Sequence, residues 1–243
     1  MDFSDLFHQS SKDRTGGGTV RVPHDESLWP PEWRTVSYKS YPRFKKISLP
    51  EAKPTGEFAE LIDRRRSGRS FSGKPVTIDA LSAILKYSCG IIGDNAGRKI
   101  RAQPSGGSRY PIEVYPLVFA GSETVPAGLY HYGVKDHALD VLWQRPFSKA
   151  DIGSLFTYDW AQDASVAFVM TAIFDRTKRK YGERGYRYAL LEAGHIGQNV
   201  YLNAAASGIK CVAIDGIHDE AIEKLIDIDG TTESVLYALC VGT

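Results

Sequence analysis

The chain has 243 residues, of which 42% are hydrophobic and 24% are charged, as in a folded protein with one sizeable core. The formal net charge of +1 gives no overall electrostatic reason to expect a nucleic acid or a membrane surface as partner. The 3 cysteines form no CxxC pair, which argues against a disulfide framework or a zinc site. Neither a signal peptide nor an apolar run of membrane-spanning length is found, so we expect a cytoplasmic protein.

Residues 1–54 are predicted to form an N-terminal arm, because three glycines at 16–18 and repeated prolines interrupt any long helix or strand. Aromatic residues recur in this segment, including Trp29, Trp33 and Tyr38. We therefore expect the arm to lie on its own domain or on a partner subunit. The first 20 residues carry less apolar surface and are expected to be mobile, at least in part.

Residues 55–243 are predicted to form one α+β domain, a mostly antiparallel sheet flanked by helices. The first helix starts at Thr55 as N-cap and directs Phe58, Leu61 and Ile62 inward. A second helix follows Thr77 as its cap. The remaining predicted elements are a loop over 93–111, a strand over 112–120, a hairpin over 128–142, a buried strand over 165–174, a long helix over 186–207, a short apolar segment over 209–216, a helix over 219–226 and a last strand over 234–242.

The long helix over 186–207 contains no proline, and its apolar and small residues recur at spacings of three and four. Glu192, His195, Gln198 and Asn199 are assigned to its polar face. Two helical glycines within this stretch indicate close approach of another backbone or of a flat ligand. A central core helix with tolerated glycines is the alternative.

Three short stretches could carry chemistry. The sequence RRRSGRSF at 64–71 offers arginine forks suited to phosphate oxygens, although a solvated basic helix end has the same composition. PSGGSRYP at 104–111 could expose backbone N–H groups to a flat or anionic ligand, although it could be an ordinary loop. KYG at 180–182 supplies two possible proton-transferring groups, with a surface lysine and a packing tyrosine as the alternative.

The order of these stretches, followed by EAGHIGQNVYLNAAASGI and VAIDG, resembles the SagB-type branch of the nitroreductase superfamily. Five motifs in order over about four-fifths of the chain make the resemblance specific. It implies a nitroreductase-like fold, an FMN cofactor and a domain-exchanged homodimer with two sites at the interface. Many members of this branch oxidise azoline rings in ribosomally made peptides to azoles. No metal is implied.

The resemblance also implies roles for individual residues. The first motif would hold the FMN phosphate, ribityl chain and pyrimidine edge, and the second would lie against the FMN bound mainly to the partner subunit. The segment after the long helix would direct a backbone N–H toward flavin N5, and the KY pair would form the catalytic base region. The implied cofactor-binding residues are Arg65, Arg66, Ser67, Arg69, Pro104, Ser105, Gly106, Ser108, Asp215 and Gly216, and the implied catalytic residues are Lys180 and Tyr181.

Two departures from the family pattern matter. Many members complete the phosphate site with a basic tail, whereas this sequence ends in CVGT, so Arg64, Arg98 or Arg101 would have to compensate. No separate peptide-binding domain is evident, so a cyclodehydratase or leader-binding protein would be a separate partner.

The leading hypothesis is an FMN-dependent dehydrogenase of thiazoline or oxazoline rings in a modified peptide. An NAD(P)H-dependent nitro or quinone reductase and a flavin-free interaction subunit on the same fold remain alternatives.

Overall fold

The computed structural model describes residues 2–12, 25–34, 36, 38–39, 42–43, 45–50 and 56–243. The helices are α1 (Phe3–Ser11), η1 (Glu26–Leu28), α2 (Pro31–Arg34), α3 (Gly56–Arg64), α4 (Ile78–Cys89), η2 (Gly106–Ser108), α5 (Lys149–Leu155), η3 (Asp159–Asp163), α6 (Asp175–Tyr181), α7 (Arg184–Ala206) and α8 (Asp219–Ile226), where η marks a 3-10 helix. The strands are β1 (Ile91–Asn95), β2 (Arg98–Arg101), β3 (Ile112–Val118), β4 (Gly128–Gly133), β5 (Ala138–Gln144), β6 (Val166–Ile173), β7 (Lys210–Ile214) and β8 (Glu233–Gly242).

Six strands form the main sheet, in the order β5-β4-β3-β6-β8-β7, and all neighbouring pairs are antiparallel. Strand β6 lies in the middle of the sheet and is buried along almost its whole length. Its continuous apolar sequence is what a strand covered on both faces requires. The predicted α+β fold with a mostly antiparallel sheet is therefore confirmed.

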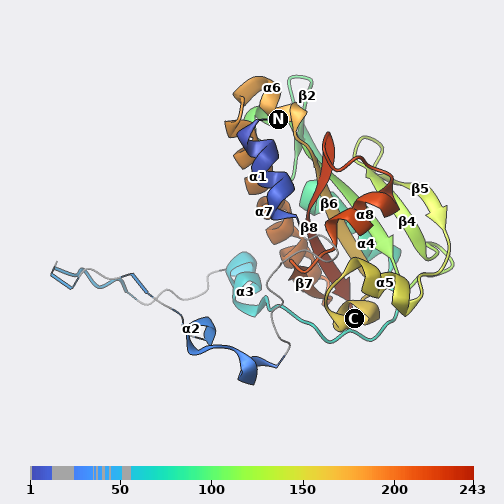
Figure 1. Ribbon diagram of the computed structural model, residues 1–243, viewed down its shortest axis with the longest axis horizontal. Coiled ribbons are helices and arrows are strands. Elements are labelled where there is room, and N and C mark those ends of the chain that lie inside the picture. The colour runs from blue at the N-terminus through green and yellow to red at the C-terminus, as the bar shows by residue number, and fades with distance from the viewer. Residues whose placement is uncertain are drawn as a thin grey trace.

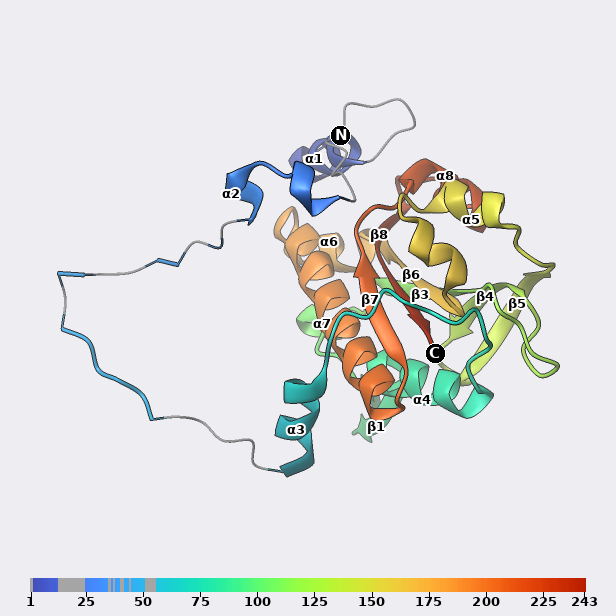
Figure 2. The same cartoon turned by 90° about the horizontal axis from the view of Figure 1, so that it is seen from below.

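Helices cover both faces of this sheet (Figures 1 and 2). Side chains alternate between the two faces of a strand, so Phe168 of β6 packs with α4 and α7, whereas Val169 packs with α5 and α8. The two hydrophobic cores are thus separated by the sheet. Helix α7 runs along one whole face and is the element from which the candidate site is built.

Helix α1 is an addition to the predicted elements. The Asp2 carboxylate caps it by accepting from the Asp5 N–H at 2.9 Å. His8 is buried against the rings of Phe174 and Tyr186. The expectation of a mobile start is therefore wrong for residues 2–12, which form a capped and docked helix.

Helix α3 corrects a second prediction. Its Phe58 and Ile62 side chains are 68% and 43% exposed, and no residue of the helix is buried. The helix extends to one side of the sheet (Figure 1), so it has little surface to pack against within this chain. Thr55, the predicted N-cap, and glycines 16–18 lie outside the described residues. In the arm, Tyr38 is 86% exposed and therefore has no cover from its own domain.

The segment predicted as a loop over 93–111 contains the β1–β2 hairpin. Its strands pair antiparallel from Ile91 opposite Arg101 to Asn95 opposite Arg98. Most residues of the hairpin are exposed, so it lacks the apolar alternation by which strands are recognised. Among the described helices, none combines the length and apolar character that crossing a membrane requires.

Candidate functional site

The first basic motif lies beside the C-terminal half of α7. Ser67 forms a parallel bridge with Cys211 at the start of β7, and its hydroxyl lies 3.2 Å from the Tyr201 hydroxyl. The Tyr201 hydroxyl also accepts from the Ala213 N–H at 2.6 Å. The Arg65 guanidinium sits over the Tyr201 ring, 5.2 Å from its centroid. Tyr201 is therefore the residue that ties this motif to α7 and β7.

Arg66 and Arg69 of the same motif are exposed. Arg66 Nη1 donates to the backbone carbonyls of Asp63 and Arg65 at 2.6 and 2.8 Å. For Arg69, the described residues include no hydrogen-bond or ion-pair partner, so its donors are free for a ligand. The motif thus presents cations at the surface, as an anion site requires.

Asp215 and Gly216 follow β7 and lie near the same end of α7. Burial, followed by the nearby Asp215 carboxylate, raises the pKa of Tyr237 to about 12. The Gly216 carbonyl accepts from the Thr157 N–H at 2.8 Å. A Cβ added to Gly216 would lie 2.8 Å from the Tyr158 ring, so only glycine fits here. Asp215 lies two residues after Ala213, whose N–H donates to the Tyr201 hydroxyl that also contacts Ser67.

The second motif forms a strained loop at the other end of α7. Its backbone turns through Gly107 at φ 61°, Ser108 at φ 53° and Tyr110 at φ 47°. Left-handed φ values at non-glycine residues cost free energy and persist only where surrounding contacts hold them. The Ser105 hydroxyl is one such contact, because it accepts from the Tyr110 N–H at 2.9 Å. Gly106 packs closely on the Tyr188 ring.

Lys180 and Tyr181 lie directly against this loop. A Cβ added to Gly107 would overlap the Tyr181 hydroxyl and lie 2.8 Å from Lys180 Nζ. The Tyr181 ring meets the Tyr188 ring edge-on at 5.0 Å. Lys180 itself is exposed. The structure therefore joins the predicted catalytic pair to the predicted PSGG loop, which the sequence could not establish.

Helix α6, which carries the pair, is held from two sides. Arg109 Nε donates to the Arg176 carbonyl at 3.1 Å, and Arg176 Nη1 donates to the Tyr110 carbonyl at 3.0 Å. On the other side, Lys178 forms ion pairs with Asp2, the N-cap of α1, and with Asp5 of α1, at 2.5 and 2.7 Å. Burial alone would lower the pKa of Lys178, but its bonds to these carboxylates raise it above the ordinary value.

A buried carboxyl group lies beneath the loop. Glu192 is only 2% exposed, and its Oε1 accepts from Gln103 Nε2 at 3.1 Å. Burial raises the pKa of Glu192, whereas the nearby Ser105 hydroxyl and Gln103 lower it. Glu192, which is assigned to the polar face of the helix, is therefore buried on that face. In the sequence, the feature that marks Glu192 is its spacing of four residues from Tyr188, which places both side chains on one face of α7, about one helical turn apart.

The predicted site residues thus form two groups that do not meet within one chain. The first motif contacts α7 at Tyr201, and the loop contacts it at Tyr188. These positions are 13 residues apart, which corresponds to about 20 Å along an α-helix. We call the group around Ser67 the phosphate-side half and the group around Gly107 the loop-side half.

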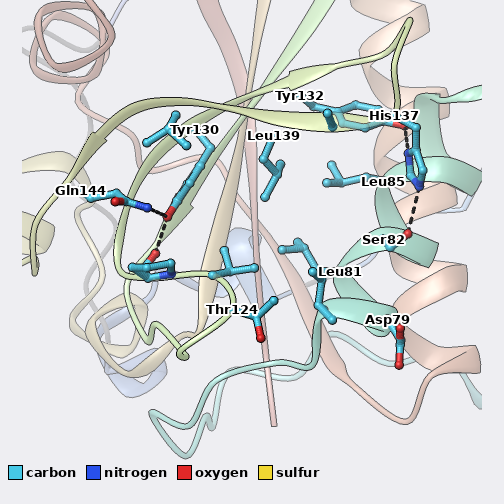
Figure 3. A pocket seen from close by; sticks show the side chains of 15 residues that line it. Asp79, Leu81, Ser82, Leu85, Thr124, Tyr130, Tyr132, His137, Leu139 and Gln144 are labelled. Atoms are coloured by element: carbon cyan, nitrogen blue, oxygen red, sulfur yellow. Dashed lines mark hydrogen bonds between the residues drawn. The ribbon is translucent and has the colours of Figure 1, made fainter.

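A cavity of about 460 Å³ lies elsewhere, between α4 and the β4–β5 hairpin (Figure 3). His137 links the Tyr132 and Ser82 hydroxyls across its edge, at 2.7 and 2.9 Å. None of the predicted site residues lines this cavity. Within the described residues, no group of three or more His, Cys, Asp and Glu side chains could hold a metal ion.

Comparison with protein families identifies the fold. The nitroreductase family model matches residues 62–243, which is most of the chain. The chain belongs to the nitroreductase family. Members of this family generally bind flavin. A putative nitroreductase from Methanocaldococcus jannaschii is 29% identical over 182 residues, which cover 75% of this chain and 89% of that protein.

Two other relatives of this nitroreductase-family chain are peptide-processing proteins. The trifolitoxin-processing protein TfxB of Rhizobium leguminosarum bv. trifolii is 30% identical over 68% of this chain and 47% of its own length. The microcin B17-processing protein McbC of Escherichia coli is 33% identical over 58% of this chain and 54% of its own length. The matches to these two proteins therefore span only about half of each. Both support membership of the SagB-type branch.

Solved structures agree on the fold. A chain of the E. coli microcin synthetase McbBCD complex with truncated pro-MccB17 bound has a TM-score of 0.70, at 22% identity over 93% of this chain and 84% of that chain. A putative nitroreductase from Ralstonia eutropha has a TM-score of 0.63, at 23% identity over 81% of this chain and 88% of that chain. At these identities the likeness shows the nitroreductase-like fold alone.

The two halves fit a flavin mononucleotide by their chemistry. The phosphate-side half supplies the exposed Arg66 and Arg69, and arginine forks match phosphate oxygens. The loop-side half has two glycines, Gly106 and Gly107, packed on Tyr188 and Tyr181, and a glycine carries no side chain that would keep a flat ring from its backbone. Each half alone would cover only part of such a ligand. The fit therefore requires both halves at one place.

Proposed function

We propose that the protein is an FMN-dependent dehydrogenase that oxidises thiazoline or oxazoline rings in a ribosomally synthesised peptide to thiazoles or oxazoles. The contact of Lys180 and Tyr181 with Gly107 carries this proposal, because it sets a proton-accepting pair against the loop expected to face the flavin. The names of TfxB and McbC, both peptide-processing proteins, support the substrate class. A cytoplasmic location is part of the proposal.

In this mechanism each residue has a defined task. Arg65, Arg66, Ser67 and Arg69 would bind the phosphate and pyrimidine ends of FMN, and the Pro104–Ser108 loop would lie against its ring. Bound FMN would supply the hydride acceptor. Lys180 or Tyr181 would remove the proton from the azoline Cα. The anchoring of α6 by Arg176 and Lys178 fixes where that base stands relative to the loop.

A homodimer would unite the two halves. Leu191 of α7 is 61% exposed, and a Cβ added to Gly194 would meet nothing within 4 Å, so this face is free to pack on another helix. Two α7 helices packed antiparallel about a two-fold axis would bring the phosphate-side half of one chain to the loop-side half of the other. A separate cyclodehydratase or leader-binding protein would deliver the peptide, in keeping with the complex named for the microcin synthetase.

The first test is a visible absorption spectrum of the purified protein, followed by identification of any flavin released on denaturation. Next, a peptide with one thiazoline ring is incubated aerobically and examined by mass spectrometry for loss of two hydrogens. We expect Lys180→Ala to abolish this loss and to retain bound FMN. A protein that stays colourless after addition of FMN would contradict the enzyme proposal, and a fully active Lys180→Ala variant would contradict the role of Lys180.

An NAD(P)H-dependent nitro or quinone reductase is the second candidate, since the relative from M. jannaschii is described as a putative nitroreductase. Rapid oxidation of NADH without any peptide, with a nitroarene or quinone as acceptor, would favour this activity. Slow oxidation together with ring oxidation would favour the dehydrogenase.

A further inference from the structure

The cavity between α4 and the β4–β5 hairpin opens beside strand β5, and we call it the β5 pocket. Its volume of about 460 Å³ falls within the range of ligand pockets, roughly 300–1,000 Å³. Leu81 and Leu85 of α4 form a buried floor, at 3% and 4% exposed. Ile78 and Val141 line the same space but are 48% and 55% exposed, so they mark its mouth. The mouth therefore lies between the start of α4 and strand β5.

The polar groups of the β5 pocket are hydrogen-bonded to one another at its two ends (Figure 3). At one end, His137 links the Tyr132 and Ser82 hydroxyls, and burial lowers the pKa of His137, so its imidazole is neutral at neutral pH. At the other end, Gln144 Nε2 donates to the Tyr130 hydroxyl at 3.3 Å. The side chains between these ends are aliphatic, and they include Leu81, Leu85 and Leu139. The middle of the pocket therefore suits apolar groups better than ions.

Strand β5 is the last strand on its side of the main sheet, and its outer edge is paired with no other strand of the described chain (Figure 1). Backbone N–H and C=O groups on a free edge can pair with a further strand. The pairing of β5 with β4 is regular over residues 138–141 and shifts in register after them. A peptide paired with this part of the edge would place alternate side chains beside Leu139 and Val141, which is the recognition mode of strand addition.

One turn of the chain separates the β5 pocket from the loop-side half. A smaller pocket is lined by Ser108 and Tyr110 of the strained loop and by Val134 and Lys135 of the β4–β5 turn. His137, two residues after Lys135, lines the β5 pocket. An extended chain that crosses residues 134–137 could therefore reach both places.

We propose that the β5 pocket binds a segment of the substrate peptide that flanks the ring to be oxidised. The segment pairs with residues 138–141 of β5 and directs two apolar side chains, at alternate positions, into the pocket. This assignment rests on the proposed function, which supplies a peptide as substrate. The short path to the loop-side half favours that peptide over a second copy of the chain, and the apolar middle favours it over a charged small molecule. The pocket thus selects substrates by their sequence outside the ring.

The test uses short fluorescein-labelled peptides of serine and threonine without any ring, titrated into the purified protein and followed by fluorescence anisotropy. One peptide carries two leucines at alternate positions, and a second has the same composition with the leucines adjacent, so that a strand directs them to opposite faces. We expect the second peptide to bind about tenfold more weakly, because only one leucine can enter the pocket.

Val141→Asp places a short charged side chain at the mouth and should weaken binding of the first peptide about tenfold. Leu142→Asp is the matched control, because Leu142 is the next residue of β5, is 45% exposed and does not line the pocket. It should bind the peptide as wild type does. In the thiazoline assay with leucines at alternate positions beside the ring, Val141→Asp should raise KM about tenfold and leave kcat unchanged.

Equal binding of the two peptides, or wild-type binding by Val141→Asp, would overturn the proposal. Full binding of a peptide with N-methyl groups on its pairing residues would overturn the strand pairing. If Val141→Asp changes the oligomeric state in sedimentation but not peptide binding, the face belongs to a second copy and the proposal fails. A protein that binds the first peptide but oxidises no ring would contradict the proposed function and not the peptide site, whereas ring oxidation by Val141→Asp at the wild-type KM would contradict the peptide site alone.

Discussion

Gly107 offers the sharpest test of the loop-side half. Its φ of 61° lies in the left-handed region, where alanine costs about 1–2 kcal/mol. An added methyl group would also overlap the Tyr181 hydroxyl, and Tyr181 cannot move freely because its ring packs on Tyr188. Overpacking of this kind costs about 1–3 kcal/mol more. We therefore expect Gly107→Ala to lower the free energy of unfolding by about 2–5 kcal/mol.

Gly208→Ala is the matched control, because Gly208 has a φ of 68° and an added Cβ would meet nothing within 4 Å. It should cost only the conformational part, about 1–2 kcal/mol. The difference between the two variants in free energy of unfolding, measured with urea, gives the cost of the steric overlap with Tyr181. In the thiazoline assay, Gly107→Ala should lose roughly tenfold to a hundredfold in rate, because it displaces the catalytic pair, whereas Gly208→Ala should retain activity. Equal stability and equal activity of the two variants would refute the contact and the role that we derive from it.

Two buried groups give predictions on pH and stability. Burial lowers the pKa of His8 to about 4, so the folded state holds this side chain neutral, and the free energy of unfolding falls by at most about 3 kcal/mol as pH drops from about 6.5 toward 4. Urea unfolding of His8→Asn over this pH range should show a smaller loss of stability. A loss as steep as in wild type would argue against this role of His8. Burial raises the pKa of Glu192, so ionisation of this carboxyl group lowers the free energy of unfolding as pH rises above about 4.5. Glu192→Gln should remove this loss. Glu192→Ala should destabilise the protein by about 1–3 kcal/mol, because Gln103 loses its hydrogen-bond acceptor. Equal denaturant midpoints for the two Glu192 variants at pH 7 would contradict this account.

The fold could be predicted from the sequence wherever burial leaves a periodic pattern. Strand β6 is covered on both faces and is apolar throughout, and the Thr77 cap of α4 accepts from the Ala80 N–H as its sequence indicates. The β1–β2 hairpin was missed because its exposed strands carry no such pattern. Phe58 was assigned inward because an apolar residue on a helix shows which face is apolar, but not whether anything covers that face.

The candidate site could be predicted from the sequence only in part, for a similar reason. Motif composition pointed to Ser67, Gly106 and Lys180, but the residues that hold them come from distant parts of the chain. The Tyr201 hydroxyl contacts Ser67, and the Glu192 carboxyl group accepts from Gln103, and both partners are far away in the sequence. The periodic pattern of a helix does not show which distant residue its side chains will contact. The separation of the two halves along α7 likewise follows from tertiary packing, since both motifs could have met at one end of that helix.

That separation has a genetic consequence if the proposed dimer forms. A chain altered in the loop-side half, such as Lys180→Ala, keeps an intact phosphate-side half, and a chain with Arg69→Ala keeps the reverse. Each variant alone would build two defective sites. Random mixing would make half of the dimers mixed, and every mixed dimer would contain one site with both halves intact, so about a quarter of wild-type activity should return. Two inactive alleles would thus complement each other in one cell, whereas either allele expressed alone would remain null.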